Sequence, residues 1–330
     1  MEPPGPPRNP PSGGAKPLPA GPPEGHPDAV EIRFGERLTR AGQLGRSALT
    51  SGPGILWVAL FLLVPLVGIG VMSLLTRGAY GEVTWPLTGN NYRRLAGFGV
   101  LGFNTQYPYI LLRSLVLAAG TTVVCLLASF PLAFFIAGLP PRSKTIALTL
   151  VIIPFWTNLL IRTYAWQILL GPSSVLASVA VLLGLAEPGR SLYPSLFAVY
   201  IGMLCAYLPF LVLPLYTAVE KIDWTLAEAA ADLGADRVRV FRHAVLPQVV
   251  PGMVAGILLV FIPATGQFVV PDLLGGAKTV LLGNAIQQQF GPSRDWPFGS
   301  AIAFTGMAVV LAGLWVQSRL AGRSGREDLL

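Results

Sequence analysis

The stretch that decides the fold runs from Glu228 to Pro247 and reads EAAADLGADRVRVFRHAVLP. It is charged and helix-forming, yet it lies between two long apolar runs. Charged side chains are costly inside a bilayer. We therefore expect a water-facing loop of a membrane protein, at which the chain contacts something soluble.

The residues around Gly234 predict two short helices joined by a turn. From Leu226 to Leu233 most residues favour helix, either Asp223 or Thr225 can cap its start, and Glu228 lies near the N-terminus, where the dipole favours an acid. Gly234 can adopt a positive φ, and three arginines follow on a second helical stretch before the next apolar run. A helix, a glycine turn and a helix should project from the membrane.

The spacing of this stretch resembles a family motif. Permease subunits of ABC importers share a loop of the form E-A-A-x3-G-x9-I-x-L-P that docks onto the ATPase subunit, and the stretch matches it except for Ala244 in place of Ile. An ordinary amphipathic cytoplasmic loop would explain the charges but not the spacing. The resemblance implies a docking loop over residues 220–247 whose ATPase-docking residues are Glu228, Ala229, Ala230, Gly234, Leu246 and Pro247.

Composition independently indicates an integral membrane protein. Of the 330 residues, 53% are hydrophobic and only 12% are charged, whereas about 25% are charged in a soluble domain. The two cysteines, Cys125 and Cys205, fall inside apolar runs and are best explained as packing residues.

Six apolar runs are long enough to cross a bilayer, for which about 20 residues are needed. They are residues 54–75, 114–139, 145–170, 192–219, 248–270 and 298–318. A seventh run, residues 175–186, is too short and predicts a re-entrant or interfacial helix. The expected fold is therefore an all-α transmembrane bundle of six helices.

Three regions follow from this pattern. Residues 1–50 form a Pro/Gly-rich tail that we expect to be disordered, with residues 29–48 either a short amphipathic helix on the membrane or an unstructured linker. Residues 51–320 form the transmembrane domain, and residues 321–330 a C-terminal tail.

The basic residues predict the orientation. Most lie on the side that holds both termini and the docking loop, whereas the other side holds mainly Arg77, Arg93, Arg94, Arg190, Lys278 and Arg294. The richer side is expected to be the cytoplasm, which places both termini inside a multi-pass inner-membrane protein. The net charge of +7 follows from this topology, so no nucleic-acid partner is predicted.

Further segments resemble the spermidine/putrescine branch of importer permeases, specifically the first of its two permease subunits. They are PFWTN at 154–158, RTYAW at 162–166, YLPF at 207–210, LPLY at 213–216, FVVPDLLGG at 268–276 and DWPFG at 295–299. The resemblance covers residues 56–320. It implies a second permease subunit, two ATPase subunits and an extracytoplasmic solute-binding protein as partners within the lipid bilayer. The implied cargo is a polyamine, with an opine-like amine, iron(III) or thiamine as alternatives.

Polar and aromatic residues of the third apolar run are candidates for the translocation path. Asn158, Arg162 and Trp166 are four apart, so they should share one helix face. A buried arginine is costly unless it faces a polar cavity or a partner. Because a cation repels a polycation, we expect Arg162 to pair with a carboxylate, or with carbonyls where the partner permease meets this chain.

Carboxylates and aromatic rings suit a cationic cargo better than an arginine does. Asp272, Asp295 and Trp296 lie near the last outward-facing loop, and Trp156 and Trp166 offer ring faces that attract ammonium groups. The alternative roles are ordinary ones. Aromatic side chains commonly form interfacial belts, and Asp295 is well placed to cap the sixth helix.

Catalytic motifs are missing from the sequence. Residues 275–279 read GGAKT, which has Ala where an ATP-binding loop needs Gly before Lys. Two histidines, His26 and His243, are too few for a metal site. The sequence thus predicts a transport subunit that is not an enzyme and holds no cofactor or metal. The rivals, a membrane-embedded enzyme and an ATP-independent facilitator or exporter, leave the docking motif unexplained.

Overall fold

The computed structural model describes residues 52–99, 102–184, 187, 189, 191–276 and 280–327. The expected N-terminal tail and amphipathic helix lie outside these residues. The chain divides into two compact units, Met1–Pro65 and Leu66–Leu330. The boundary falls within the first helix, Gly52–Ser73, and everything below concerns the second unit.

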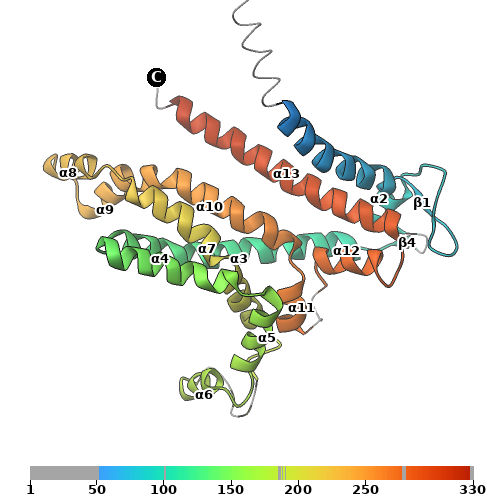
Figure 1. Ribbon diagram of the computed structural model, residues 1–330, viewed down its shortest axis with the longest axis horizontal. Helices are drawn as coiled ribbons and strands as arrows, with labels where there is room; N and C mark the ends of the chain where they lie inside the picture. Colours follow the sequence, from blue (N-terminus) through green and yellow to red (C-terminus); the bar gives the residue numbers. More distant parts are fainter. Residues whose placement is uncertain are drawn as a thin grey trace, which may run out of the picture. The chain divides into compact units, whose positions relative to one another are not determined.

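Helices make up about three quarters of the described residues (Figure 1). After the first helix they are α2 (Asn90–Leu95), α3 (Gln106–Ala137), α4 (Pro141–Trp156), α5 (Leu159–Leu169), α6 (Val175–Leu182), α7 (Leu196–Glu220), α8 (Trp224–Asp232), α9 (Arg237–Val240), the π-helix η1 (Phe241–Val245), α10 (Leu246–Gly266), α11 (Val269–Gly275), α12 (Leu282–Phe290) and α13 (Trp296–Glu327). Two small antiparallel hairpins pair β1 (Thr76–Arg77) with β2 (Val83–Thr84) and β3 (Phe98–Gly99) with β4 (Gly102–Phe103).

The expected all-α membrane architecture is confirmed. Five described helices are long and apolar enough to span a bilayer, and the count is six if α4 and α5 form one broken span. The third expected span, residues 145–170, is broken, because α4 and α5 are bent by 98°. Thr157 is extended at the break and Asn158 starts the new helix, so the apolar run is continuous while its helix is not.

Two other predicted boundaries change. The fifth span ends at Gly266 rather than residue 270, because the Gln267 side chain accepts hydrogen bonds from the backbone N–H groups of Phe268 and Val269 and starts α11 there. The short seventh run forms α6, and α13 continues through the expected C-terminal tail as far as Glu327.

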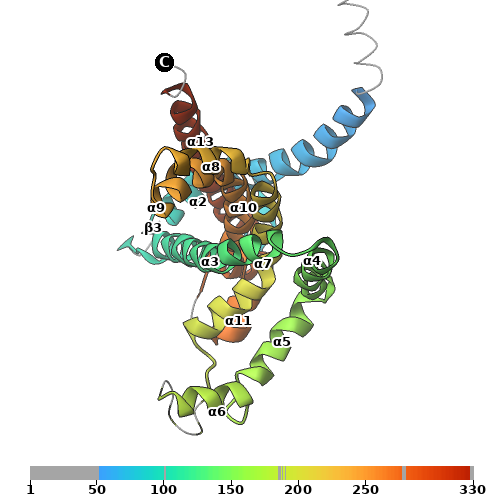
Figure 2. The ribbon, with the colours of Figure 1, turned by 90° about the vertical axis from the view of Figure 1, so that its left-hand side faces the viewer.

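The main core lies where α3, α7 and α10 pack side by side (Figures 1 and 2). Gly256 of α10 lies against the backbone of Leu211 in α7, where an added Cβ would come within 3.3 Å of the Leu211 Cα. Small residues of this kind let membrane helices approach closely. A second, smaller core joins α3, α12 and α13 around Phe298.

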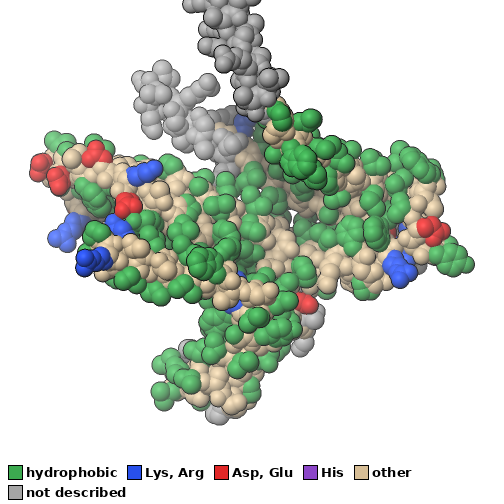
Figure 3. All heavy atoms as spheres, in the orientation of Figure 1, with side chains coloured by type: hydrophobic (Ala, Val, Ile, Leu, Met, Phe, Trp, Pro, Cys, Tyr) green, Lys and Arg blue, Asp and Glu red, His purple; other side chains and the backbone are tan. Residues whose placement is uncertain are grey.

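The two ends of this unit differ in structure. Helices α8 and α9 lie at one end, and α2 and the hairpins lie at the opposite end (Figures 1 and 2). Charged side chains gather at these two ends, while the surface between them is mostly hydrophobic (Figure 3). This distribution suits a protein whose middle lies in a bilayer and whose ends meet water.

Candidate functional site

The docking loop begins with a well-formed helix cap. The Asp223 carboxylate accepts hydrogen bonds from the Thr225 hydroxyl at 2.7 Å and the Thr225 backbone N–H at 3.0 Å. Of the two expected caps, Asp223 is the one used. These bonds from Thr225, the hydroxyl first and then the N–H, lower the pKa of Asp223 below its ordinary value. Because the pKa is lowered, the carboxylate stays ionised, and the cap persists, to a more acidic pH than for an ordinary aspartate.

The end of α8 explains the spacing between the alanines and Gly234. Gly234 has φ +85°, and its N–H donates to the Ala231 carbonyl at 2.9 Å. The N–H of Ala235 donates to the Ala230 carbonyl at 3.1 Å. These two bonds form a Schellman motif, which needs a left-handed residue just past the helix. Nothing lies within 4 Å of a Cβ added at Gly234, so the backbone conformation alone selects glycine.

One face of α8 is anchored while the other remains open. Ala227 and the preceding Ile222 are buried in the main core. Glu228 and Ala229 are exposed, and Ala230 is partly buried. Large apolar side chains are also exposed on the loop: Trp224, Leu226, Leu233 and Val238. A water-facing loop with exposed apolar side chains is typical of a surface that a partner covers.

The second half of the loop differs from its prediction. Asp236 caps α9 through the Arg239 N–H at 2.7 Å, and the helix continues through η1, which contains Ala244, into α10. The second short helical stretch thus runs on into the next apolar run and does not end before it. Pro247 is tolerated in the first turn of α10, because η1 changes the bonding pattern just before it.

Gln248 ties the start of the docking helix to α10, which the sequence reasoning missed. Its Oε1 accepts from the Asp223 backbone N–H at 2.9 Å, and its Nε2 donates to the Ala244 carbonyl at 2.7 Å. One side chain thus bridges the cap of α8 and the η1–α10 junction. The available signal was a glutamine at the head of an otherwise apolar run.

The break between α4 and α5 holds three of the expected path residues. The Asn158 side chain caps α5 by accepting from the Leu160 N–H at 2.8 Å, and the Asn158 carbonyl accepts from the Arg162 N–H at 3.1 Å, one turn along α5. Arg162 Nη1 donates to the Pro154 carbonyl at 2.7 Å. Its partner is thus a carbonyl of the same chain, at the end of α4. Trp156 is 82% exposed and Trp166 is partly buried against the main core.

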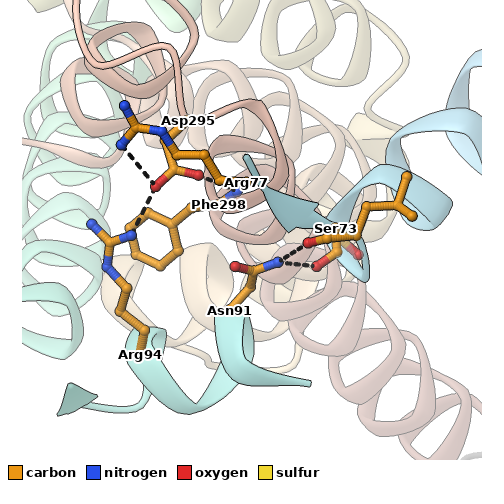
Figure 4. A network of polar contacts seen from close by, with 7 residues as sticks. Ser73, Arg77, Asn91, Arg94, Asp295 and Phe298 are labelled. Carbon is orange, nitrogen blue, oxygen red and sulfur yellow. Dashed lines mark hydrogen bonds and ion pairs between the residues drawn. The ribbon is translucent and has the colours of Figure 1, made fainter. Parts of the chain in front are cut away.

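Asp295 lies in a polar network at the end opposite the docking loop (Figure 4). It is only 3% exposed. One carboxylate oxygen accepts from the Phe298 N–H at 3.2 Å and caps α13. The other lies 2.8 Å from Arg94 Nη1 and 3.9 Å from Arg77 Nη1. The alternative role of Asp295 as a helix cap is thus observed.

The same network holds the β1–β2 hairpin and α2 in place. Asn91 Nδ2 donates to the carbonyls of Ser73 and Leu75 at 2.8 and 2.9 Å, where the first helix ends. The Arg94 guanidinium lies 3.9 Å from the centre of the Phe298 ring. Helix α2 and the β1–β2 hairpin thus both cover the start of α13.

The two acids predicted for the path lie in different surroundings. Asp272 is exposed on α11, which packs on α5 and α7. Asp295 is buried before α13, which packs on α2 and α12. Trp296 is half exposed and makes an edge-on contact with Phe290.

Comparison with known proteins identifies relatives over most of the chain. The spermidine/putrescine transport system permease protein PotB of Escherichia coli is 42% identical over 272 residues, which cover 81% of this chain and 96% of PotB. PotB of Haemophilus influenzae is 40% identical over 256 residues, covering 78% and 87% of the two chains. The inner membrane ABC transporter permease protein YdcU of E. coli is 31% identical over 301 residues, covering 82% and 93%.

Solved structures show the same fold. A bacterial ABC transporter that imports the acidic polysaccharide alginate has a chain that matches with a TM-score of 0.59 and 18% identity, covering 88% of this chain and 99% of that one. The alginate transporter in complex with a pentasaccharide-bound periplasmic protein matches with a TM-score of 0.61 and 16% identity, covering 88% and 98%.

A family model described as the binding-protein-dependent transport system inner membrane component matches residues 129–325. This match includes the broken span, the docking loop and α13, so it covers the elements that the motif and the apolar pattern singled out. The chain therefore belongs to this family, the permease subunits of ABC importers.

Proposed function

We propose that this chain is the first of two permease subunits in an ATP-driven importer of the polyamines spermidine and putrescine, and that it forms half of the translocation path. The observation that carries the proposal is the 42% identity to a spermidine/putrescine permease of which the chain covers 96%. In this proposal a second permease, two ATPase subunits and an extracytoplasmic solute-binding protein complete the importer. The chain itself is a transport subunit, and the ATPase subunits hydrolyse ATP.

Residues 220–247 are proposed to couple the permease to an ATPase subunit. Glu228, Ala229, Ala230, Gly234, Leu246 and Pro247 carry the motif, and the exposed apolar side chains of α8 and α9 support a contact there. Gln248 and the buried Ile222 link α8 to α10 and the core. Motion of a docked ATPase would thus pass into the spans as a rigid-body movement.

The proposed orientation places the docking loop and both termini in the cytoplasm. Its support is the excess of basic residues on that side. Under this orientation α2, the β1–β2 hairpin and α6 lie outside, where a binding protein approaches.

The proposed cargo path draws on Trp156, Asn158, Arg162, Trp166, Asp272, Asp295 and Trp296 in two ways. Trp156 and Asp272 are exposed, so they are available to ammonium groups. Asn158, Arg162 and Asp295 make hydrogen bonds within the chain, so they are proposed to shape the path rather than to touch the cargo.

Transport by the reconstituted complex tests the proposal. The permease would be purified with its partner subunits and its binding protein, and ATP hydrolysis and uptake measured with spermidine, putrescine, an opine-like amine, iron(III) and thiamine. We expect the two polyamines to stimulate both activities. If only another cargo stimulates ATP hydrolysis and uptake, that cargo is the substrate and the polyamines are not. Uptake without ATP would support a facilitator instead.

A further inference from the structure

Four arginines lie at the end opposite the docking loop. Arg77 lies on β1, Arg93 and Arg94 end α2, and Arg294 precedes α13, and all four are exposed. Arg77 and Arg94 converge on Asp295, while a Cβ added at Gly81 in the hairpin turn would lie 3.1 Å from the Arg294 Cβ. We call this set the arginine face.

The charge of this surface is not explained by membrane topology. Residues 74–99 and 291–295 hold these four arginines and two acids, Glu82 and Asp295, so their formal charge is 4 − 2 = +2. Asp295 is buried, which leaves the surface more positive than the sum. Basic residues on the outward side work against the positive-inside rule. Four of the basic residues assigned to that side nevertheless lie here.

Two of the guanidinium groups are held in place while part of each remains exposed. Arg77 and Arg94 have side chains 45% exposed, although both contact Asp295, and Arg94 also lies against the Phe298 ring. A guanidinium fixed on one side keeps further N–H donors in a planar fork that matches carboxylates. The surface is therefore organised before any partner arrives, which lowers the entropy cost of binding.

Exposed aromatic side chains accompany the arginines. Tyr80 in the hairpin turn is 92% exposed, and Trp85 just after β2 is 74% exposed. Arginine, tyrosine and tryptophan are the residues that most often carry binding energy in protein interfaces. The hairpin and α2 come directly after the last residue of the first span, so they lie beyond the helix end, where a soluble partner has access.

We infer that the arginine face receives the extracytoplasmic solute-binding protein, through carboxylates on the surface of that protein. This inference rests on the function and orientation proposed above. The positive charge repels a free polyamine and attracts acidic side chains. The face thus selects the loaded binding protein over free cargo, and Asp295 and Phe298 are positioning residues for Arg77 and Arg94.

The test measures how much binding protein is needed to stimulate ATP hydrolysis. The whole importer is placed in nanodiscs of phosphatidylcholine only, and hydrolysis is titrated with the spermidine-loaded binding protein of the same organism. Arg93→Glu is the main variant, because Arg93 belongs to the face but makes none of the ion pairs to Asp295. We expect it to raise the half-stimulating concentration roughly three- to tenfold at low salt, with a smaller effect from Arg93→Gln.

Salt and a matched variant control for a damaged fold. The ratio between Arg93→Glu and the unmodified protein should shrink at about 0.5 M salt, since screening weakens exposed charge pairs, whereas a misfolded variant would not recover. Arg142→Glu makes the same charge change at an exposed site that begins α4, and it should leave the half-stimulating concentration unchanged.

The other outcomes separate the rival explanations. If Arg93→Glu titrates like the unmodified protein in phosphatidylcholine, the inference is wrong. An effect seen only after phosphatidylglycerol is added would assign the face to anionic lipid headgroups and would also overturn it. If spermidine-loaded binding protein fails to stimulate even the unmodified importer, the proposed polyamine function fails instead, and the face is tested with the binding protein that does stimulate.

Discussion

At the scale of single residues, Gly234 is the position where the docking motif is most strictly determined. Its φ of +85° closes the Schellman motif, and the space around it is open. Gly234→Val should therefore act through backbone strain alone, at a cost of about 1–2 kcal/mol to the end of α8. Gly234→Asn should be milder, because asparagine tolerates this conformation.

The measurement is co-purification of the ATPase subunit together with polyamine uptake, at equal membrane insertion. We expect Gly234→Val to lose both and Gly234→Asn to keep most of each. Equal activity of the two variants would show that the left-handed turn is not needed for coupling.

Asp295 and Asp272 form a second pair of residues with opposite surroundings. Asp295→Asn keeps an oxygen for the α13 cap but removes the charge that Arg77 and Arg94 share, so it should lower the free energy of unfolding by about 1.5–3 kcal/mol. Asp272→Asn alters an exposed acid and should leave the free energy of unfolding nearly unchanged. Thermal unfolding and uptake are measured for both.

The comparison separates structure from cargo contact. Uptake that falls in Asp272→Asn with unfolding unchanged would support a cation path past α11. Unaltered uptake in both variants would remove the two acids from the path. An Asp295→Asn protein with an unchanged free energy of unfolding would contradict the conclusion that the network holds the β1–β2 hairpin and α2 in place.

At the scale of elements, Gln248 links the start of α8 to the start of α10. Gln248→Met keeps the length of the side chain and removes both hydrogen bonds, each worth about 1 kcal/mol. We expect the importer to hydrolyse ATP but to transport fewer polyamine molecules per ATP. Gln288→Met, at an exposed site of α12, is the matched control and should leave that ratio unchanged.

A purely structural role for Gln248 predicts a different result. Uptake and hydrolysis would then fall together in Gln248→Met, and the number of molecules moved per ATP would stay constant. That outcome would contradict the positioning role.

Helices and spans could be predicted from the sequence where neighbouring residues determine them. The spans follow from runs of about 20 apolar residues, and the docking helix follows from its neighbours, Asp223 at one end and Gly234 at the other. The break at Asn158 was missed because the run as a whole is apolar enough to be one span, although Pro154 and a capping asparagine were present. Helix α2, the β1–β2 hairpin and α12 were missed, because they are short and depend on tertiary contacts.

The same limit applies to the candidate site. The possible helix cap at Asp295 could be read from its position before an apolar run. Its arginine partner Arg94 lies 201 residues away in the sequence, so no local pattern reveals it. The bond from Arg162 to the Pro154 carbonyl also depends on a 98° bend that the apolar run conceals.

At the scale of the whole molecule, the two ends carry different chemistry, and the orientation decides which partner each end meets. The docking loop combines exposed apolar side chains with the EAA-type motif, and the opposite end carries the arginine face. If the first end meets an ATPase and the second a binding protein, then binding outside and hydrolysis inside act on the same packed core of α3, α7 and α10.

Cysteine labelling tests this orientation directly. The parent protein has Cys125 and Cys205 replaced by alanine. In it, Gly89→Cys reports on the end that carries α2, and Val238→Cys reports on the docking loop, both at exposed positions. Under the proposed orientation, with the more basic side in the cytoplasm, a membrane-impermeant maleimide applied to intact spheroplasts should label Gly89→Cys nearly completely and Val238→Cys only after lysis. The parent protein controls for background. The reverse pattern would invert the topology, placing the docking loop where no ATPase can reach it.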